Sequence, residues 1–242
     1  MDTLIPLEIT PETRVGDIVA ACPGLARLFE ELRIDYCCGG KQTLAAACAS
    51  RGLAPATVVA QLEATAAALQ AGPAEVDPAR MSLTELADHI ESTHHAYLKD
   101  ELPRLVEMAG RVAAKHGHRD GRLLEVDVTV RALAEEMLCH MNKEELILFP
   151  LVRQIDAGHL GGLAGSIADP IHQMEAEHDD AGRAIERLRQ LTGGFVPASD
   201  DCNTHRALLD GLARFEADLH RHVHKENNVL FPRALTLVLD GR

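Results

Sequence analysis

The sequence predicts an all-α protein in which a four-helix bundle follows a small helical domain. Three observations support this fold class. Leu, Ala and Val dominate an apolar fraction of 46%, whereas aromatic residues make up 3%, and such a composition suits helices better than strands. Apolar residues recur at steps of three and four along most of the chain, as on the buried face of a helix. Gly and Pro clusters separate these periodic segments.

Residues 1–71 form the predicted small helical module. Four of its apolar residues share one helix face: Leu25, Leu28, Phe29 and Leu32. The segment Tyr36-Cys37-Cys38-Gly39-Gly40 breaks the helical pattern. A short helix is then expected to begin near Thr43 and to end at Gly52. Pro55 suits the first turn of the next helix.

Residues 72–80, which contain Gly and Pro, are the predicted linker, and residues 81–242 are the predicted bundle. Ser82 and Glu85 make a capping-box pattern that opens the first helix of the bundle. Pro103 lies inside this helix and is expected to kink it or to end a segment.

The other three bundle helices carry core-facing stripes. The stripe of the second helix contains Val126, Val130, Leu133, Met137, His140, Glu144 and Ile147. The third helix is expected to open with Asp169 as N-cap and Pro170 in its first turn, and its stripe contains Ile171, Met174, His178, Ala181, Ile185 and Leu188. The stripe of the fourth helix contains Leu208, Leu212, Phe215, Leu219, His222, Glu226 and Val229. Polar His and Glu thus lie inside stripes where Leu would be expected.

An internal repeat places these polar residues at matching positions. Four residues recur 82 positions later: His140, Glu144, Phe149 and Pro150 become His222, Glu226, Phe231 and Pro232. Upstream, His95 and His178 are offset by 83 positions. Two copies of one helix hairpin therefore each supply a His, then His-x3-Glu, then Phe-Pro.

The His-x3-Glu spacing turns both side chains toward one point, because residues four apart lie on the same helix face. The predicted metal ligands are His95, His140, Glu144, His178, His222 and Glu226. Burying so many polar groups without partners would be costly, and a metal centre offsets that cost. Imidazole and carboxylate suit iron, manganese or zinc, and two carboxylates that can bridge favour a dinuclear site. The alternative is a hydrogen-bonded polar layer in a structural bundle without metal.

His94 and His95 are adjacent, and only one of them can face the bundle axis. His95 precedes His140 by 45 positions, which matches the 44 positions between His178 and His222 better than the 46 that His94 gives. His95 is therefore the predicted ligand.

Glu91 and Glu175, one turn before His95 and His178, are candidates to accept hydrogen bonds from the ligands. The remaining His fall into three groups. His89 and His172 are expected at the surface or around the ligands. Solvent exposure is expected for His116, His118 and His159, and faces away from the axis are expected for His205, His220 and His224.

The formal net charge of −13 argues against nucleic acid as a partner, because phosphates favour Lys and Arg. It also argues against anionic membrane surfaces. No apolar run approaches the roughly 18 residues of a membrane span, and the first residues lack the apolar core of a signal peptide. We therefore expect a cytoplasmic protein whose six Cys are reduced thiols.

Several motifs together resemble the Repair of Iron Centres family. The segment Asp35-Tyr36-Cys37-Cys38-Gly39-Gly40-Lys41-Gln42-Thr43-Leu44 resembles the signature of that family's amino-terminal module. Three motifs resemble its hemerythrin-like domain: His140-x3-Glu144-Glu145-x3-Phe149-Pro150, Glu177-His178-Asp179-x-Ala181-Gly182 and Glu226-Asn227-Asn228-x-Leu230-Phe231-Pro232. The resemblance covers almost the whole chain, with the motifs in the same order.

This resemblance implies a hemerythrin-like four-helix bundle that holds two non-haem iron ions with an oxo bridge. If both carboxylates and the oxo group bridge two six-coordinate irons, about two coordination positions stay open. The implied function is the repair of iron–sulfur clusters damaged by nitrosative or oxidative stress. The implied partners are damaged iron–sulfur proteins, with nitric oxide or oxygen as small ligands, and a homodimer is compatible with the sequence. Iron donation and nitric-oxide chemistry both stay open.

The sequence departs from the oxygen-carrying hemerythrins at two positions. Those proteins have a fifth His one turn after the ligand on the third helix, where this chain has Gly182, and an Asp where it has Glu226. The more open site argues against reversible oxygen carriage. A sensor of oxygen or nitric oxide, and a di-iron oxidase or nitric-oxide reductase, are the rival functions, so whether the chain is an enzyme stays open. A sensor would need an output domain, and none is visible.

Cys37 and Cys38 are the candidate residues for thiol chemistry or iron transfer. The Gly-Gly turn and the helix expected near Thr43 could lower the pKa of these thiols through the helix N-terminus. The alternative is a pair of small buried residues in a turn. The other Cys are expected to be packing residues: Cys22, Cys48, Cys139 and Cys202.

Overall fold

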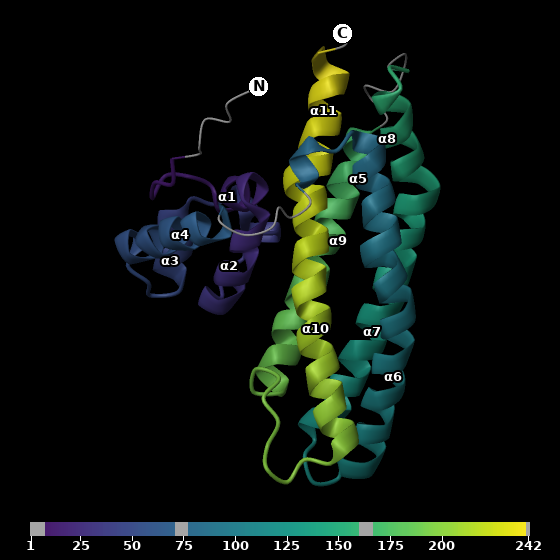
Figure 1. Ribbon diagram of the computed structural model, residues 1–242. Coiled ribbons are helices and arrows are strands. Elements are labelled where there is room, and N and C mark those ends of the chain that lie inside the picture. Colours follow the sequence, from purple (N-terminus) through teal and green to yellow (C-terminus); the bar gives the residue numbers. More distant parts are fainter. Residues whose placement is uncertain (1–7, 71–76, 160–166, 241–242) are drawn as a thin grey trace.

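The computed structural model describes residues 8–70, 77–159 and 167–240. Throughout these residues the regular elements are helices, and no strand occurs among them. A small helical module lies beside a bundle of long helices (Figure 1). The predicted all-α fold class is therefore confirmed.

The amino-terminal module consists of short helices around its own apolar core. The elements are α1 (Val15–Ala21), η1 (Pro23–Leu25), α2 (Ala26–Leu32), η2 (Cys38–Lys41), α3 (Leu44–Ser50) and α4 (Pro55–Gln70). The Thr43 hydroxyl accepts a hydrogen bond from the backbone N–H of Ala46 and caps α3. The predicted helix starts near Thr43 and at Pro55 are both confirmed. Phe29, Tyr36 and Leu62 fill the centre of the module.

Three of the four bundle helices consist of two α-helical segments joined by a π-helical turn. The first contains α5 (Leu83–Ile90), η4 (Glu91–His95) and α6 (Ala96–His116). The second contains α7 (Arg122–Lys143), η5 (Glu144–Leu148) and α8 (Phe149–Asp156). The third is α9 (Ala168–Leu191). The fourth contains α10 (Asn203–Lys225), η6 (Glu226–Leu230) and α11 (Phe231–Asp240).

The helix ends agree with the sequence in some places and differ in others. The capping box of Ser82 and Glu85 is present as predicted. Pro103 was expected to kink the helix or to end a segment, and it ends no segment, because α6 runs past it to His116. Asp169 was expected as an N-cap, but α9 begins at Ala168, so Asp169 lies within the first turn. Such shifts of one or two residues are common at helix ends.

The π-turns change which residues face the core. A π-turn holds one more residue than an α-turn, so the apolar stripe advances by one position. Ile147, predicted in the stripe, is 55% exposed, whereas Leu148 is 1% exposed. In the fourth helix both Val229 and Leu230 stay buried, because α1 of the module packs against η6.

The bundle core forms two apolar clusters separated along the axis. One cluster contains Leu98, Val130, Ile185 and Leu212, and the other contains Ile90, Val152, Met174 and Ala234. In every bundle helix the predicted metal ligands come between residues of the two clusters. The polar site therefore lies between apolar layers that exclude water.

The predicted linker, 72–80, falls partly outside the described residues, since these omit 71–76. Its last residues form η3 (Pro78–Arg80). Arg233 of α11 donates hydrogen bonds to the carbonyl oxygens of Pro78 and Met81, so this part of the linker is attached to the bundle.

Within the described residues, no single helix combines the length and apolar character needed to cross a membrane. One bent pair, Leu44–Ser50 with Pro55–Leu69 at 116°, meets those criteria of length and composition together.

Candidate metal centre

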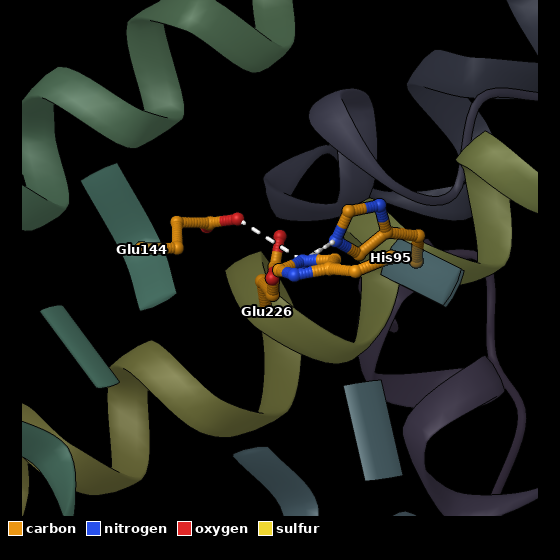
Figure 2. Close-up of side chains that lie close together, drawn as sticks. His95, Glu144 and Glu226 are labelled. Atoms are coloured by element: carbon orange, nitrogen blue, oxygen red, sulfur yellow. Dashed lines mark hydrogen bonds and ion pairs between the residues drawn. The ribbon is translucent and has the colours of Figure 1, made fainter. Parts of the chain in front are cut away.

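The structure brings all six predicted ligand residues together at the bundle axis. His95 ends η4, Glu144 begins η5 and Glu226 begins η6, so three ligands belong to π-turns. The other three ligands lie in α-helices: His140 in α7, His178 in α9 and His222 in α10. All six side chains are at most 2% exposed. Figure 2 shows His95, Glu144 and Glu226 converging from three different helices.

The six residues form two overlapping groups of possible ligands. One group contains His95, His222, Glu144 and Glu226, and the other contains His140, His178, Glu144 and Glu226. Within each group the ligand atoms lie within 4.8 Å of one another. Both carboxylates belong to both groups, so each can bridge two metal ions. Each group also takes one His from each copy of the repeat, so the two hairpins complete each other's sites.

Distances between the ligand atoms show how closely they converge. The Nε2 atoms of His95 and His140 each lie 3.3 Å from Oε2 of Glu144. The Nε2 atom of His178 lies 3.1 Å from Oε2 of Glu226, and that of His222 lies 3.0 Å from Oε1 of Glu226. The paired imidazoles meet through Nε2, at 3.2 Å for His95 and His222 and 3.0 Å for His140 and His178.

The buried carboxylate oxygens indicate that these residues fit metal ions. Both oxygens of Glu144 and Oε2 of Glu226 are buried and accept no well-aligned hydrogen bond from the described residues. The polar atoms that approach the two Oε2 atoms are Nε2 atoms of the ligand imidazoles. Burial raises the pKa of Glu144, but the imidazoles of His140 and His95 outweigh this effect and hold the pKa below its ordinary value. The carboxyl group therefore favours its charged form. Charged oxygens without well-aligned donors are costly in a water-free core. Four imidazole nitrogens with two bridging carboxylates are a donor set that suits a pair of iron ions.

Three of the four imidazoles have an acceptor at Nδ1, which directs the lone pair of Nε2 to the centre. The acceptors are Glu145 for His95 at 2.8 Å, Glu177 for His140 at 2.9 Å and Asn227 for His178 at 2.9 Å. Lys99 in turn donates to Glu145, while Lys143 and Gln173 donate to Glu177. Burial raises the pKa of Glu177, but these hydrogen bonds outweigh it and lower the pKa to about 2.

The sequence-based choice of orienting residues was wrong. Glu91 forms an ion pair with Arg153, and Glu175 forms one with Lys41, so neither contacts a ligand imidazole. The actual acceptors are neighbours of the ligands in sequence: Glu145 follows Glu144, Glu177 precedes His178 and Asn227 follows Glu226. Glu145 and Asn227 are also 82 positions apart. The repeat therefore relates Glu145 to Asn227, whereas Glu177 has no carboxylate or amide counterpart in the first copy, where His94 stands.

His222 differs from the other ligand imidazoles. Its Nδ1 atom is buried and has no hydrogen-bond partner in the described part of the chain. The ring of His94 stacks on it instead, with centroids 5.4 Å apart and planes at 6°. The Nδ1 atom of His94 contacts Asp218 at 3.0 Å, and its Nε2 atom contacts Lys225 Nζ at 2.6 Å. His94 therefore belongs to neither ligand group.

The Phe-Pro pairs of the repeat follow the π-turns and cover the ligands. The ring of Phe149 lies parallel to that of His95 at 5.6 Å and 15°, and the ring of Phe231 lies parallel to that of His178 at 6.2 Å and 6°. Each Phe thus packs on the imidazole contributed by the preceding helix of its own hairpin. The following Pro has no N–H to donate, which suits a position where the helical ladder changes register.

Cys37 and Cys38 lie where the module meets the bundle. The Sγ atom of Cys37 lies 3.1 Å from Oδ1 of Asp35, and the Cys38 thiol lies 3.5 Å from the carbonyl oxygen of His178. Asp35 and the two thiols form a third group of atoms within 4.8 Å. Contact with Cys38 and burial raise the pKa of the Cys37 thiol. The expectation that a helix N-terminus lowers the pKa is therefore wrong for Cys37.

The two thiols line a cleft of about 820 Å³ between the module and the bundle, together with His178 and Gly182. A Cβ atom at Gly182 would lie 3.8 Å from the Sγ atom of Cys38. The position that holds a fifth His in oxygen-carrying hemerythrins therefore faces a thiol of the amino-terminal module.

His224 lies on a face away from the bundle axis, as expected, and is buried there with its Nδ1 atom 3.3 Å from the carbonyl oxygen of Tyr36 in the module. Two other residues lie differently from the expectations. The Nε2 atom of His116 is partly buried, 3.3 Å from the Sγ atom of Cys202, rather than solvated. Cys139, expected to pack inside, is exposed.

Comparison with known proteins gives matches to both parts of the chain. A family model described as the hemerythrin HHE cation-binding domain matches residues 86–234, and one described as a domain of unknown function (DUF542) matches residues 11–66. A protein of Pectobacterium atrosepticum is 40% identical over 222 residues, which are 91% of this chain and 96% of that protein. A protein of Yersinia pseudotuberculosis is 39% identical with the same coverage. One of Musicola paradisiaca is 38% identical over 225 residues, or 93% and 96% of the two chains. All three are named iron-sulfur cluster repair protein YtfE.

Proposed function

Because this chain belongs to the hemerythrin HHE cation-binding family and to the family of the iron-sulfur cluster repair proteins, we propose that it repairs iron–sulfur clusters with a di-iron centre. One observation carries the proposal: two groups of buried ligand atoms share the carboxylates of Glu144 and Glu226. Two carboxylates shared in this way can each bridge a pair of adjacent metal ions.

The residues of the bundle have distinct tasks in this proposal. His95 and His222 would hold one iron, His140 and His178 would hold the other, and both Glu would bridge them. When bound, the oxo-bridged irons supply exchangeable iron and a redox site for nitric oxide or oxygen. Glu145, Glu177 and Asn227 hold the imidazoles in orientation. The apolar layers on both sides exclude water from the centre.

Cys37 and Cys38 are proposed to transfer iron or to exchange thiol-bound groups with a damaged iron–sulfur protein. Thiolates bind iron in transit well and are good nucleophiles, whereas the bundle ligands are harder donors. The position of both thiols in the cleft beside His178 supports this role. A cytoplasmic location and a homodimer remain predictions from the sequence.

Reduction of nitric oxide at the same centre is the second candidate. The observation that favours it is Gly182, which leaves space where the oxygen-carrying hemerythrins have a fifth His. The two candidates predict different fates of the bound iron. Iron donation removes it from the protein, whereas reduction of nitric oxide leaves it in the protein.

The test is to load the protein with iron and to add it to an iron–sulfur enzyme that nitric oxide has inactivated. We expect close to two irons per chain, one for each ligand group, and recovery of the enzyme's activity. Cys37→Ser combined with Cys38→Ser should keep both irons but slow recovery. Cys139→Ser is the matched control, because this thiol is exposed and distant in sequence from the cleft. One zinc and no iron per chain after iron loading would contradict the proposal, and a double variant that repairs at the normal rate would make the Cys pair structural.

A further inference from the structure

The internal duplication makes the six ligands equivalent in pairs, but the contacts around them are not equivalent. Glu177 precedes His178 by one position, and the residue at the matching position of the first copy is His94, 83 positions earlier. Glu177 accepts a hydrogen bond from Nδ1 of His140. His94 offers no such acceptor and stacks on His222. At this position of the repeat, the first copy thus has the imidazole of His94 and the second copy has the carboxylate of Glu177.

The neighbouring lysines show that the rest of this arrangement is preserved. Lys143 and Lys225 are 82 positions apart. Lys143 donates to Glu177, and Lys225 Nζ lies 2.6 Å from Nε2 of His94. In both copies a lysine therefore contacts the residue that directly precedes a ligand, which is Glu177 or His94. Because His94 stands where the other copy has a carboxylate, Nδ1 of His222 has no partner among the described residues.

The two ligand groups differ accordingly. In the group of His140 and His178, both imidazoles have an acceptor at Nδ1. In the group of His95 and His222, only His95 has one. An acceptor at Nδ1 fixes the orientation of the ring and makes Nε2 a stronger donor, and losing one such partner typically weakens metal binding 10- to 100-fold.

We propose that the two iron positions are unequal, that the iron at His95 and His222 is the one released for repair, and that His94 and Glu177 are the positioning residues that set this difference. The inference rests on the proposed di-iron centre. It assigns different roles to the two ligand groups. The group of His140 and His178, in which both Nδ1 atoms have an acceptor, retains its iron. The group of His95 and His222 releases its iron.

The experiment measures the release of iron from the fully loaded protein to an excess of chelator. We expect two phases of one iron each, with the fast phase about 10- to 100-fold faster than the slow one. Mössbauer spectra of the ⁵⁷Fe-loaded protein before and after the fast phase should show two signals of equal area, of which one disappears. A residue that only stabilised the fold would not select one signal.

Two substitutions act on opposite halves. Glu177→Gln removes the charged acceptor of His140 and should accelerate only the slow phase, by about 10- to 100-fold. His94→Glu provides an acceptor for Nδ1 of His222, with Lys225 already in place to pair with it, and should slow only the fast phase. Because Asp218 would repel the new carboxylate, His94→Glu with Asp218→Asn is the second form of this variant.

The outcomes separate this inference from the function on which it rests. A loaded protein with fewer than two irons per chain would contradict the di-iron centre itself. Two irons that leave in a single phase, or phases that Glu177→Gln does not alter selectively, would overturn the assignment while leaving the di-iron centre intact. A fast phase unchanged in both forms of the residue 94 variant would overturn the role of His94.

Discussion

At the scale of single residues, His94 and His95 show how one helical step separates two roles. The side chains are 2% and 0% exposed, so burial alone does not distinguish them. Nε2 of His95 lies 3.3 Å from Glu144, while His94 contacts Asp218 and Lys225. Burial lowers the pKa of His94 to about 4, so this imidazole is neutral at ordinary pH and does not add a positive charge beside the metal site.

His95→Ala should lower the iron content to about one per chain or less, because it removes a direct ligand. His94→Ala should keep close to two irons at saturating iron, since it removes only a stacking ring. The iron content of both purified variants, with their optical spectra, checks this. The reverse result would mean that the first bundle helix is rotated by about 100° relative to the structure.

The repeat predicted the six ligands because helical spacing is a local property of the sequence. Its steps of three and four placed His140, Glu144, His222 and Glu226 on the axis without knowledge of any neighbour. The outer partners could not be predicted in this way. Glu177 and His140 are 37 positions apart, and which side chains meet across two helices depends on the rotation of each helix in the bundle.

At the scale of elements, the sequence did not predict the π-turns. Each of the three described π-turns begins or ends at a predicted ligand: η4 at His95, η5 at Glu144 and η6 at Glu226. A π-turn is rarely favoured by local propensity and often occurs at functional sites. The one-residue shift also explains why Ile147 was assigned to the wrong face while Val126 and Met137, before the turn, were assigned correctly.

Leu148→Ala and Ile147→Ala test this register. Leu148 is buried in the core cluster that contains Ile90 and Val152, so its truncation should lower the free energy of unfolding by about 2–5 kcal/mol. Ile147 is 55% exposed, so its truncation should change that free energy by no more than about 0.5 kcal/mol. Urea unfolding of both variants at equal iron loading is the measurement. A larger loss for Ile147→Ala would show that the second helix continues without a π-turn.

At the scale of the whole molecule, one turn joins the metal centre to the amino-terminal module. Three consecutive residues of η6 have three roles: Glu226 belongs to both groups of possible metal ligands, Asn227 contacts His178, and Asn228 holds the module. The amide of Asn228 donates to the carbonyl oxygens of Tyr36 and Cys37. Its position requires glycine on the opposite side, since a Cβ atom at Gly40 would lie 2.4 Å from Oδ1 of Asn228.

Gly40→Ala should therefore displace the module and expose Cys37, which is 5% exposed in the native chain. Overpacking of this kind costs about 1–3 kcal/mol, which corresponds to a rise of about 5- to 150-fold in the labelling rate of Cys37. Peptide mass spectrometry after timed labelling measures that rate. Combining Gly40→Ala with Asn228→Ala removes the clash but also the hydrogen bonds, so labelling should fall below that of Gly40→Ala alone. Equal labelling of Cys37 in wild type and Gly40→Ala would show that this contact does not hold the module.

The buried carboxylates of Glu144 and Glu226 also link the abundance of the protein to its metal. An ion that binds only the folded chain adds to its stability by mass action, by about 2.7 kcal/mol at a hundredfold excess over the dissociation constant. Without the ion, two buried negative charges oppose the folded state. When the iron supply falls, the unfolded fraction accessible to proteases would rise. The cell would then keep this chain in proportion to the iron available for it to carry.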